Sequence, residues 1–328
     1  MSAAAADAST VPPEMAHALR DAFGDQPVDG FAIVKGGRSG ATIASFDVAG
    51  QGYIARRGDA TLPGYADRMA RALTCMTMAS DIGVAPKLRH VDRAAGVCIL
   101  ERIPHAPSAR GPRRTEHIAA TLRRLHAGPA FPRVGGALAL VRHLDEHLRA
   151  RSHSGLPNEL LDRMDDLAAL TTPFAESAPC HNDLNPGNIL ETPDAVYFID
   201  WETACASDPF LDLALLGVFD FPTPGSRTEL LEAYLARRPS EAERARAIVT
   251  RVMALGYYAA AFCGAMIAGG GPARPAASPL PVPEMLRLLA TLRERAPAEV
   301  VAASLLDEMR RETDADGFES AKRALAAG

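Results

Sequence analysis

Residues 181–202, with the sequence HNDLNPGNILETPDAVYFIDWE, constrain this chain more strongly than any other segment. The Asn-Pro-Gly triplet in its first half cannot continue a helix, so a tight loop is predicted there. Such a loop turns the side chains of Asp183 and Asn188 into one cleft. The apolar run 195–199 is typical of a short buried strand, and it brings Asp200 up beside Asn188.

The order of these polar residues fits phosphoryl transfer. Kinase-type phosphotransferases use the pattern His-x-Asp-x-x-x-x-Asn, then a strand, then Asp, to place a base and two metal ligands. Asn188 and Asp200 offer the oxygen ligands that Mg²⁺ prefers, which leaves Asp183 free to accept a proton from a substrate hydroxyl. An isolated His-x-Asp or Asn-Pro-Gly turn often only closes a loop. The complete ordered set, followed by the acidic run 208–212, favours the functional interpretation.

HNDLNPGNIL, followed by FIDWETACASDPFLDLALL, resembles the aminoglycoside phosphotransferase and choline kinase superfamily. The IDWE motif and the nearby DPxxDLA are most similar to its choline/ethanolamine kinase branch. The resemblance implies an α+β, bilobal, protein-kinase-like fold. Its small N-terminal lobe would carry an antiparallel β-sheet and one helix, and its larger C-terminal lobe would be mainly helical. It also implies phosphorylation of a small-molecule alcohol with ATP and Mg²⁺.

The resemblance also assigns roles to residues of the motif. By position, Asp183 is the catalytic base, and Asn188 and Asp200 are the metal ligands. Glu202 is an additional acid near the metal or the substrate, and we group it with the metal ligands. His181 belongs to the catalytic segment, where it is expected to orient the loop rather than to react.

Two further acids follow the motif. Asp208 and Asp212 are expected to accept backbone N–H bonds at the start of the next helix, where negative charge is favoured.

The composition argues against several other classes of protein, namely nucleic-acid-binding, zinc-binding, secreted and membrane proteins. The net charge of −5 argues against a nucleic-acid-binding surface. The five cysteines are odd in number and widely spaced, which suits a reducing cytosol and matches no zinc-ligand pattern. No run reaches the roughly 18 apolar residues that a membrane span needs, and no secretory signal is apparent. The sequence therefore predicts a soluble cytoplasmic protein, with residues 1–12 as a disordered tail.

Residues 13–104 are predicted to form the N-terminal nucleotide-binding lobe. A helix at 13–23 and three strands, at 30–34, 42–48 and 53–57, are expected in it. The turn between the first two strands is rich in glycine, which lets backbone N–H groups approach phosphates closely. The turn residues expected to bind the nucleotide are Gly36, Gly37, Ser39 and Gly40. A plain hairpin turn is the alternative interpretation.

A cation on the third strand is the next part that a kinase site needs. No lysine lies in 53–57, and the resembling proteins often carry Arg there, so Arg56 is the candidate that binds the α/β-phosphates. The alternative is a surface arginine on an edge strand. A helix is predicted over 64–82, with one buried face formed by Met69, Leu73, Met76 and Ala79 or Ser80. It lacks the glutamate that kinase folds use to orient this cation. Asp67 is therefore expected to pair with Arg56.

The last strands of this lobe are predicted within 83–103. Adenine is expected to meet the backbone of the hinge that follows them. The hinge residues placed at the nucleotide are Glu101, Arg102 and Ile103.

Residues 105–328 are predicted to form the C-terminal catalytic and acceptor-binding lobe. A helix is expected over 115–126, with Thr115 as its N-cap and His126 as a hydrogen-bonded residue at its end. Two amphipathic helices follow in 138–170. The later helical segments are 227–268, broken at Pro239-Ser240, and 283–327. The intervening Pro- and Gly-rich run 269–283 is either one wall of the acceptor pocket or a passive connector.

Aromatic side chains are the candidates for binding the acceptor. A quaternary ammonium group needs an aromatic box, and the chain has one tryptophan. The residues placed at the substrate are Trp201, Tyr257, Tyr258 and Phe262. The last three stand where the resemblance would lead one to expect tryptophans, which argues against choline specifically and leaves ethanolamine-like amines, amino sugars, aminoglycosides and other alcohols open as acceptors. A nucleotide-binding pseudokinase and a protein kinase are the alternative classes, and the absence of DFG and APE sequences argues against the second.

Overall fold

The computed structural model describes residues 11–34, 41–58, 65–105, 111–152, 154–174, 177–291 and 297–326. The predicted phosphate-binding turn, with Gly36, Gly37, Ser39 and Gly40, lies outside these residues, and so does most of the predicted N-terminal tail. The chain divides into two compact units. The first comprises residues 1–110 and 188–204, and the second comprises 111–187 and 205–328. The prediction had placed the lobe boundary at 104 and residues 188–204 in the second lobe.

The first unit is built on a mixed set of strands and helices. Its elements are α1 (Pro13–Phe23), β1 (Val28–Ile33), β2 (Thr42–Val48), β3 (Gln51–Arg57), α2 (Tyr65–Asp81), β4 (Leu88–Asp92), β5 (Val97–Glu101), β7 (Ile189–Glu191) and β8 (Val196–Phe198). Five strands form one antiparallel sheet in the order β1-β2-β3-β5-β4. Strand β3 is therefore the central strand, which excludes the edge-strand interpretation of its arginines.

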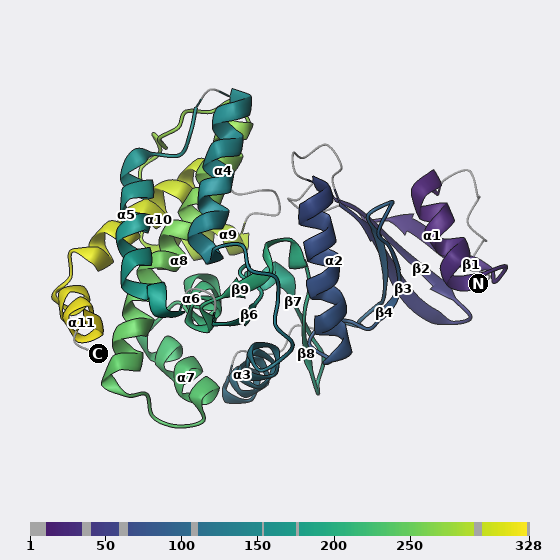
Figure 1. The fold of residues 1–328 in the computed structure, drawn as a ribbon, viewed down its shortest axis with the longest axis horizontal. Coiled ribbons are helices and arrows are strands. Elements are labelled where there is room, and N and C mark those ends of the chain that lie inside the picture. Colours follow the sequence, from purple (N-terminus) through teal and green to yellow (C-terminus); the bar gives the residue numbers. More distant parts are fainter. Residues whose placement is uncertain are drawn as a thin grey trace. The chain divides into compact units, whose positions relative to one another are not determined.

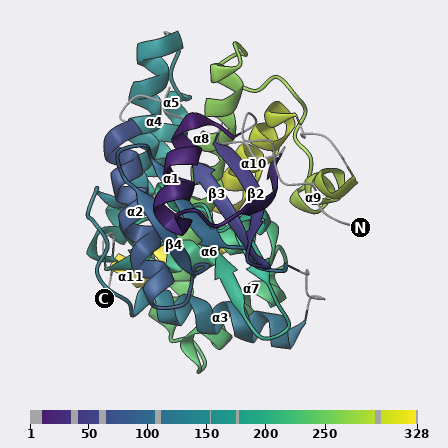
Figure 2. The same cartoon turned by 90° about the vertical axis from the view of Figure 1, so that its right-hand side faces the viewer.

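The sheet carries a helix on each face (Figure 1). Helix α1 begins and ends at the predicted residues, and Met15 and Phe23 on its apolar side are buried against Phe46 and other sheet residues. Figure 2 shows α1 lying across the strands. Helix α2 lies on the other face and buries Met69, Leu73 and other predicted positions. The 3.6-residue period of apolar residues thus predicted this buried face correctly.

The short hairpin of β7 and β8 belongs to the first unit although it comes much later in the sequence. The backbone N–H of Phe198 donates to the carbonyl of Val84, just after α2, over 2.8 Å. Ile189 pairs with Phe198 in antiparallel register. The predicted buried strand at 195–199 is confirmed as β8, and the hairpin carries the polar residues at its ends into this unit.

The second unit is mainly helical. Its elements are α3 (Pro112–His126), α4 (Gly136–Ser152), α5 (Asn158–Thr171), β6 (Ala178–Cys180), β9 (Cys205–Ser207), α6 (Pro209–Phe219), α7 (Pro224–Leu235), α8 (Glu241–Ala268), α9 (Val282–Thr291), α10 (Ala298–Thr313) and α11 (Asp316–Ala326). The predicted helix break at Pro239-Ser240 is confirmed, and residues 269–281 contain no helix. Thr115 is not the N-cap of α3, because the helix begins at Pro112 after Gly111.

Helix α8 forms the centre of the second unit, with α4, α5, α6, α10 and α11 packed against it (Figure 1). Its length and apolar composition would also suffice to cross a membrane. However, 78% of its most apolar window is buried inside the protein, as expected for the core helix of a folded unit. It is the single candidate span among the residues that the structure describes, and it is weak evidence for one.

A capping box starts α8 at Ser240. The Ser240 side chain accepts the backbone N–H of Glu243, and the Glu243 carboxylate accepts the N–H of Ser240 over 2.7 Å. Hydrogen bonding to Arg237 and Ser240 lowers the pKa of Glu243 from 4.5 to about 2. Because the pKa of Glu243 is lower in the folded state than in the unfolded state, its carboxylate stabilises the folded protein. This stabilisation is complete above pH 4.5 and is lost as the pH falls toward 2.

We predict that Glu243→Gln lowers the free energy of unfolding by about 1 kcal/mol at pH 7, the value typical of a helix cap near solvent. The difference from the wild type should shrink as the pH falls from 4.5 toward 2, since the unfolded state then binds a proton that the folded carboxylate, with its pKa of about 2, does not. Urea unfolding across this pH range measures it. Glu241→Gln, an exposed change in the same turn without a cap contact, is the control. A difference that is constant with pH would contradict the prediction.

Candidate active site

A buried carboxylate in the second unit fixes the loop that follows β6. Asp212 is fully buried and accepts two consecutive backbone N–H groups, from His181 over 2.9 Å and from Asn182 over 2.8 Å. A charged acceptor makes such bonds stronger than neutral ones. Asp212 was expected to accept bonds at the start of its own helix α6, and that expectation is wrong. It instead holds the loop from a position one turn into the helix.

The side chains of the loop support one another locally. The ring Nδ1 of the buried His181 accepts the backbone N–H of Asp183 over 3.3 Å, and a role of His181 in orienting the loop stays a prediction. Asn185 donates to the Asp183 carboxylate over 3.0 Å and accepts the N–H of Gly187 over 2.9 Å. Asn182 adopts a left-handed backbone with φ of 61°. The Asp183 carboxylate is thereby oriented while it stays partly open to solvent.

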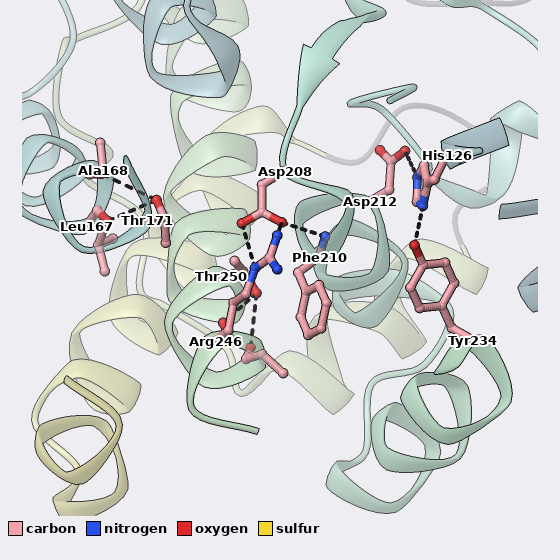
Figure 3. Close-up of polar contacts among 11 residues, drawn as sticks. His126, Leu167, Ala168, Thr171, Asp208, Phe210, Asp212, Tyr234, Arg246 and Thr250 are labelled. Atoms are coloured by element: carbon pink, nitrogen blue, oxygen red, sulfur yellow. Dashed lines mark hydrogen bonds and ion pairs between the residues drawn. The ribbon is translucent and has the colours of Figure 1, made fainter. Parts of the chain in front are cut away.

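The side chains of His126 and Tyr234 form a chain of hydrogen bonds that ends at the Asp212 carboxylate (Figure 3). His126 at the end of α3 lies with Nε2 3.1 Å from the Asp212 carboxylate and with Nδ1 2.9 Å from the Tyr234 hydroxyl of α7. With a neutral ring, Nε2–H donates to Asp212 and the Tyr234 hydroxyl donates to Nδ1. Burial raises the pKa of Tyr234, which keeps that hydroxyl protonated as a donor. The expectation of a hydrogen-bonded His126 at a helix end is confirmed.

Asp208 is the N-cap of α6, as predicted. Its carboxylate accepts the backbone N–H of Phe210 over 2.7 Å and pairs with Arg246 of α8 over 2.5 Å (Figure 3). Burial raises the pKa of Asp208, and Arg246 opposes that rise. The Arg246 guanidinium lies between the rings of Phe174 and Phe210, which adds cation–π attraction. The pair joins the start of α6 to α8.

One group of side chains here has the composition of a metal site. His126, Cys180 and Asp212 offer ligand atoms within 4.8 Å of one another. However, both ring nitrogens of His126 and both oxygens of Asp212 already make hydrogen bonds. Burial also raises the pKa of Cys180 well above its ordinary value, which disfavours the thiolate that binds metals. This group therefore does not fit a metal ion.

The first unit holds the residues that were predicted as metal ligands. Asn188 directly precedes β7, and Asp200 follows β8 closely, so the hairpin register brings the two together. The backbone N–H of Ile199 donates to the Asn188 carbonyl over 3.0 Å and fixes that register. Asp200 adopts a left-handed backbone with φ of 67°, a conformation that Asp tolerates better than most residues. An amide and a carboxylate are suitable ligands for Mg²⁺.

Arg56 on the central strand β3 reaches the same segment. Its Nη2 lies 2.8 Å from the Asp200 carboxylate and 2.5 Å from that of Glu202. Burial opposes the charged guanidinium, but Asp200 and Glu202 more than offset this, and the pKa of Arg56 is raised. The expected pairing of Arg56 with Asp67 is wrong in this structure, because Asp67 lies on the exposed side of the first turn of α2.

The predicted hinge residues make contacts of their own. The backbone N–H of Glu101 donates to Lys87, and that of Arg102 donates to Gly52. The Arg102 side chain pairs with Asp47 over 2.6 Å. These contacts belong to the sheet and its edge, so a role of Glu101, Arg102 and Ile103 in binding adenine stays a prediction.

The predicted acceptor residues differ in their surroundings. Trp201 is only 3% exposed, and its indole N–H donates to the Phe198 carbonyl over 3.2 Å, so the structure gives it a packing role. Tyr257 and Tyr258 are both buried in α8, and Phe262 is half-buried against the same core. Burial raises the pKa of Tyr258 well above its ordinary value, and the negative charge of Asp183 adds to that rise. Among the acceptor candidates, Tyr258 is the one whose raised pKa includes a contribution from the charge of Asp183.

Sequence reasoning identified neither Tyr234 as the partner of His126 nor Arg246 as the partner of Asp208. One signal was available. Asp212 is a charged residue within the apolar helix PFLDLALLGVF, and a buried acid in such a helix needs hydrogen-bond partners. Its partners could not be identified from the helix alone, because they come from distant parts of the chain.

Comparison with known proteins identifies the family to which this chain belongs. A family model described as the phosphotransferase enzyme family matches residues 31–248. The chain belongs to this family. The predicted superfamily membership is thus confirmed, and this family supports a small-molecule kinase.

Solved structures confirm the protein-kinase-like fold of this family. A choline/ethanolamine kinase family protein from Mesorhizobium loti has a TM-score of 0.64 and 20% identity, covering 91% of this chain and 92% of that one. The choline kinase LicA from Streptococcus pneumoniae has a TM-score of 0.60 and 15% identity, covering 94% and 96%. At these identities the similarity shows the fold alone.

A curated relative matches a short segment at higher identity. Protein LicA from Haemophilus influenzae is 43% identical over 60 residues, which cover 16% of this chain and 22% of that protein. The match thus spans less than a quarter of the relative's length.

We predict that Asp212→Asn lowers the free energy of unfolding by about 3 kcal/mol, because a buried charged acceptor of two backbone N–H groups is lost. Tyr234→Phe removes one neutral hydrogen bond and should cost about 1 kcal/mol. Urea unfolding at pH 7 compares the two variants. If Asp212→Asn cost no more than Tyr234→Phe, Asp212 would not be the main anchor of the loop.

Proposed function

We propose that this protein transfers the γ-phosphoryl group of ATP, with Mg²⁺, to the hydroxyl of a small, cationic alcohol. The observation that carries the proposal is the Asp183 carboxylate, which is oriented by Asn185 and partly open to solvent on a loop that Asp212 holds. A base in that state can accept a proton from a hydroxyl. Membership of the phosphotransferase enzyme family supports the type of reaction.

Asp183 is the proposed catalytic base. As the substrate oxygen forms its bond to the γ-phosphorus, Asp183 accepts the hydroxyl proton. The bond between the γ-phosphorus and the β–γ bridging oxygen breaks, and ADP leaves with the electron pair. His181 and Asn185 orient the carboxylate through the contacts described above.

Asn188 and Asp200 are the proposed ligands of Mg²⁺, since both offer oxygen donors at one end of the β7–β8 hairpin. The ion, when bound, neutralises phosphate charge. Arg56 is the proposed cation that binds the nucleotide phosphates, in place of the usual lysine. The roles of residues 36–40 and 101–103 at the nucleotide stay predictions.

A cationic acceptor is supported by the charge of Asp183 and by the aromatic ring of the buried Tyr258, since both kinds of group attract an ammonium ion. The charge of Asp183 contributes to the raised pKa of Tyr258. The similar proteins include a choline kinase and a choline/ethanolamine kinase family protein. Amino sugars and aminoglycosides are the second candidates, because they share the amino alcohol chemistry. A cytoplasmic location stays a prediction.

We expect Asp183→Asn to abolish phosphoryl transfer, since general-base assistance contributes roughly 10²–10⁴ in rate. The affinity for ATP should change no more than a few-fold. Asp166→Asn, an exposed change on α5, is the matched control and should keep full activity. Transfer is followed as ADP release with a panel of alcohols. Near-wild-type turnover by Asp183→Asn would remove this residue from the mechanism, and a wild type inactive with every alcohol would favour a pseudokinase.

The acceptor class gives a separate prediction. Choline, ethanolamine or an amino sugar should outcompete glucose and glycerate as acceptors. Tyr258→Leu should raise the acceptor KM while the KM for ATP is unchanged, because the cation–π share is roughly 0.5–2 kcal/mol. Tyr258→Phe keeps the aromatic face and should have a smaller effect, and Tyr257→Leu is the neighbouring control. Preference for neutral or anionic alcohols, with Tyr258→Leu unaffected, would contradict the cationic acceptor but not the kinase.

A further inference from the structure

Helix α2 lacks the residue that kinase folds use to orient the phosphate-binding cation. In those folds a helix glutamate pairs with a lysine on the third strand. Helix α2, YADRMARALTCMTMASD, contains no glutamate. It contributes arginines instead, and these reach the segment after β8.

Glu202 receives contacts from three arginines of the first unit. Its carboxylate lies 2.5 Å from Arg56 Nη2 and 3.8 Å from Arg68 Nη2. Its backbone carbonyl accepts a hydrogen bond from Arg71 of α2 over 2.9 Å. Cys75 of α2 also donates to the carbonyl of Ala204, two residues later, over 3.6 Å. Helix α2 thus holds the turn that carries Glu202.

We propose that Glu202 is the positioning residue that orients Arg56, with α2 supplying arginines that hold Glu202. The pair of a strand cation and an acid is thereby kept, but the acid comes from the IDWE motif instead of the helix, and helix α2 supplies arginines that contact this acid. This inference rests on the proposed function, since it assumes that Arg56 binds nucleotide phosphates.

Glu202 fits this role better than Asp200, the other acid beside Arg56. The side chain of Asp200 is 30% exposed and that of Glu202 is 18% exposed. Asp200 also stands with Asn188 at the end of the hairpin, where its carboxylate can bind a cation. Arg56 is only 15% exposed, and a guanidinium in that position needs an acid that stays with it. If Asp200 binds the metal ion, Glu202 is the acid that remains paired with Arg56.

The competing role for Glu202 is that of a metal ligand, and nucleotide binding distinguishes the two. The affinity for ATP is measured by calorimetry without metal, in EDTA, and at saturating Mg²⁺. The variants are Glu202→Gln, Glu202→Asp, Arg56→Met and the double variant Glu202→Gln/Arg56→Met. Glu14→Gln is the matched control, because Glu14 pairs with the neighbouring Arg57 over 3.5 Å and not with Arg56.

We expect Glu202→Gln to weaken ATP binding roughly tenfold, the effect of one lost charged hydrogen bond, by the same factor with and without Mg²⁺. Arg56→Met should lose at least as much, and the double variant should lose no more than Arg56→Met alone, because the two residues act as one unit. Glu202→Asp should fall between the wild type and Glu202→Gln. The Mg²⁺ concentration for half-maximal effect should be unchanged in all of them.

Two outcomes would overturn the inference alone. Glu202→Gln could bind ATP as the wild type does, or its loss could be seen only at low Mg²⁺ and recovered at saturation, as for a metal ligand. A wild type that binds no ATP under either condition would instead overturn the proposed function, and the inference would fall with it. Circular dichroism of each variant confirms that it is folded.

Discussion

The buried carboxylate of Asp212 is the interaction on which the loop of residues 181–187 depends. It accepts the backbone N–H groups of His181 and Asn182, and His126 holds it from the other side. Because these bonds fix the backbone rather than a side chain, they determine the direction in which the following Asp183 projects. The cost of burying the charge is offset by three donors in a site closed to water. A loop with a left-handed residue at Asn182 needs such support to stay in one conformation.

The first unit also buries a charged group, the guanidinium of Arg56, which is positive where Asp212 is negative. Arg56 lies on the central strand of the sheet and is largely buried, so its guanidinium needs acids close by. Both acids come from the segment after β8, which α2 holds through Arg71 and Cys75. The hairpin of β7 and β8 thus brings Asp200 and Glu202 to a strand some 145 residues earlier in the sequence. Each unit therefore contains a buried charge with several hydrogen-bond or ion-pair partners beside a residue of the proposed site.

Local sequence patterns predicted much of this architecture. The bounds of α1, the buried face of α2, the strand at β8 and the N-cap at Asp208 all follow from periodicity and capping chemistry within short windows. Thr115 was taken as a cap because it precedes an apolar run, whereas Pro112 at the first position already starts the helix.

Long-range pairings could not be predicted in the same way. Asp67 was chosen as the partner of Arg56 because it is the nearest acid on the helix where kinase folds have theirs, yet the acids that pair with Arg56 come from the IDWE motif. Tyr234 and His126 are 108 residues apart, and no local pattern links them. Such contacts depend on how distant elements pack, which a single sequence does not contain.

We propose that residues of the HNDLNPGN and IDWE motifs bind a metal nucleotide for phosphoryl transfer. Diffraction at the manganese edge, from crystals grown with Mn²⁺ and a non-hydrolysable ATP analogue, tests it most directly. We predict an anomalous peak between the Asn188 amide oxygen and the Asp200 carboxylate, with Arg56 on the phosphates and still paired with Glu202. A peak at His126, Cys180 and Asp212, or an analogue bound away from Arg56 and Asp200, would contradict the claim.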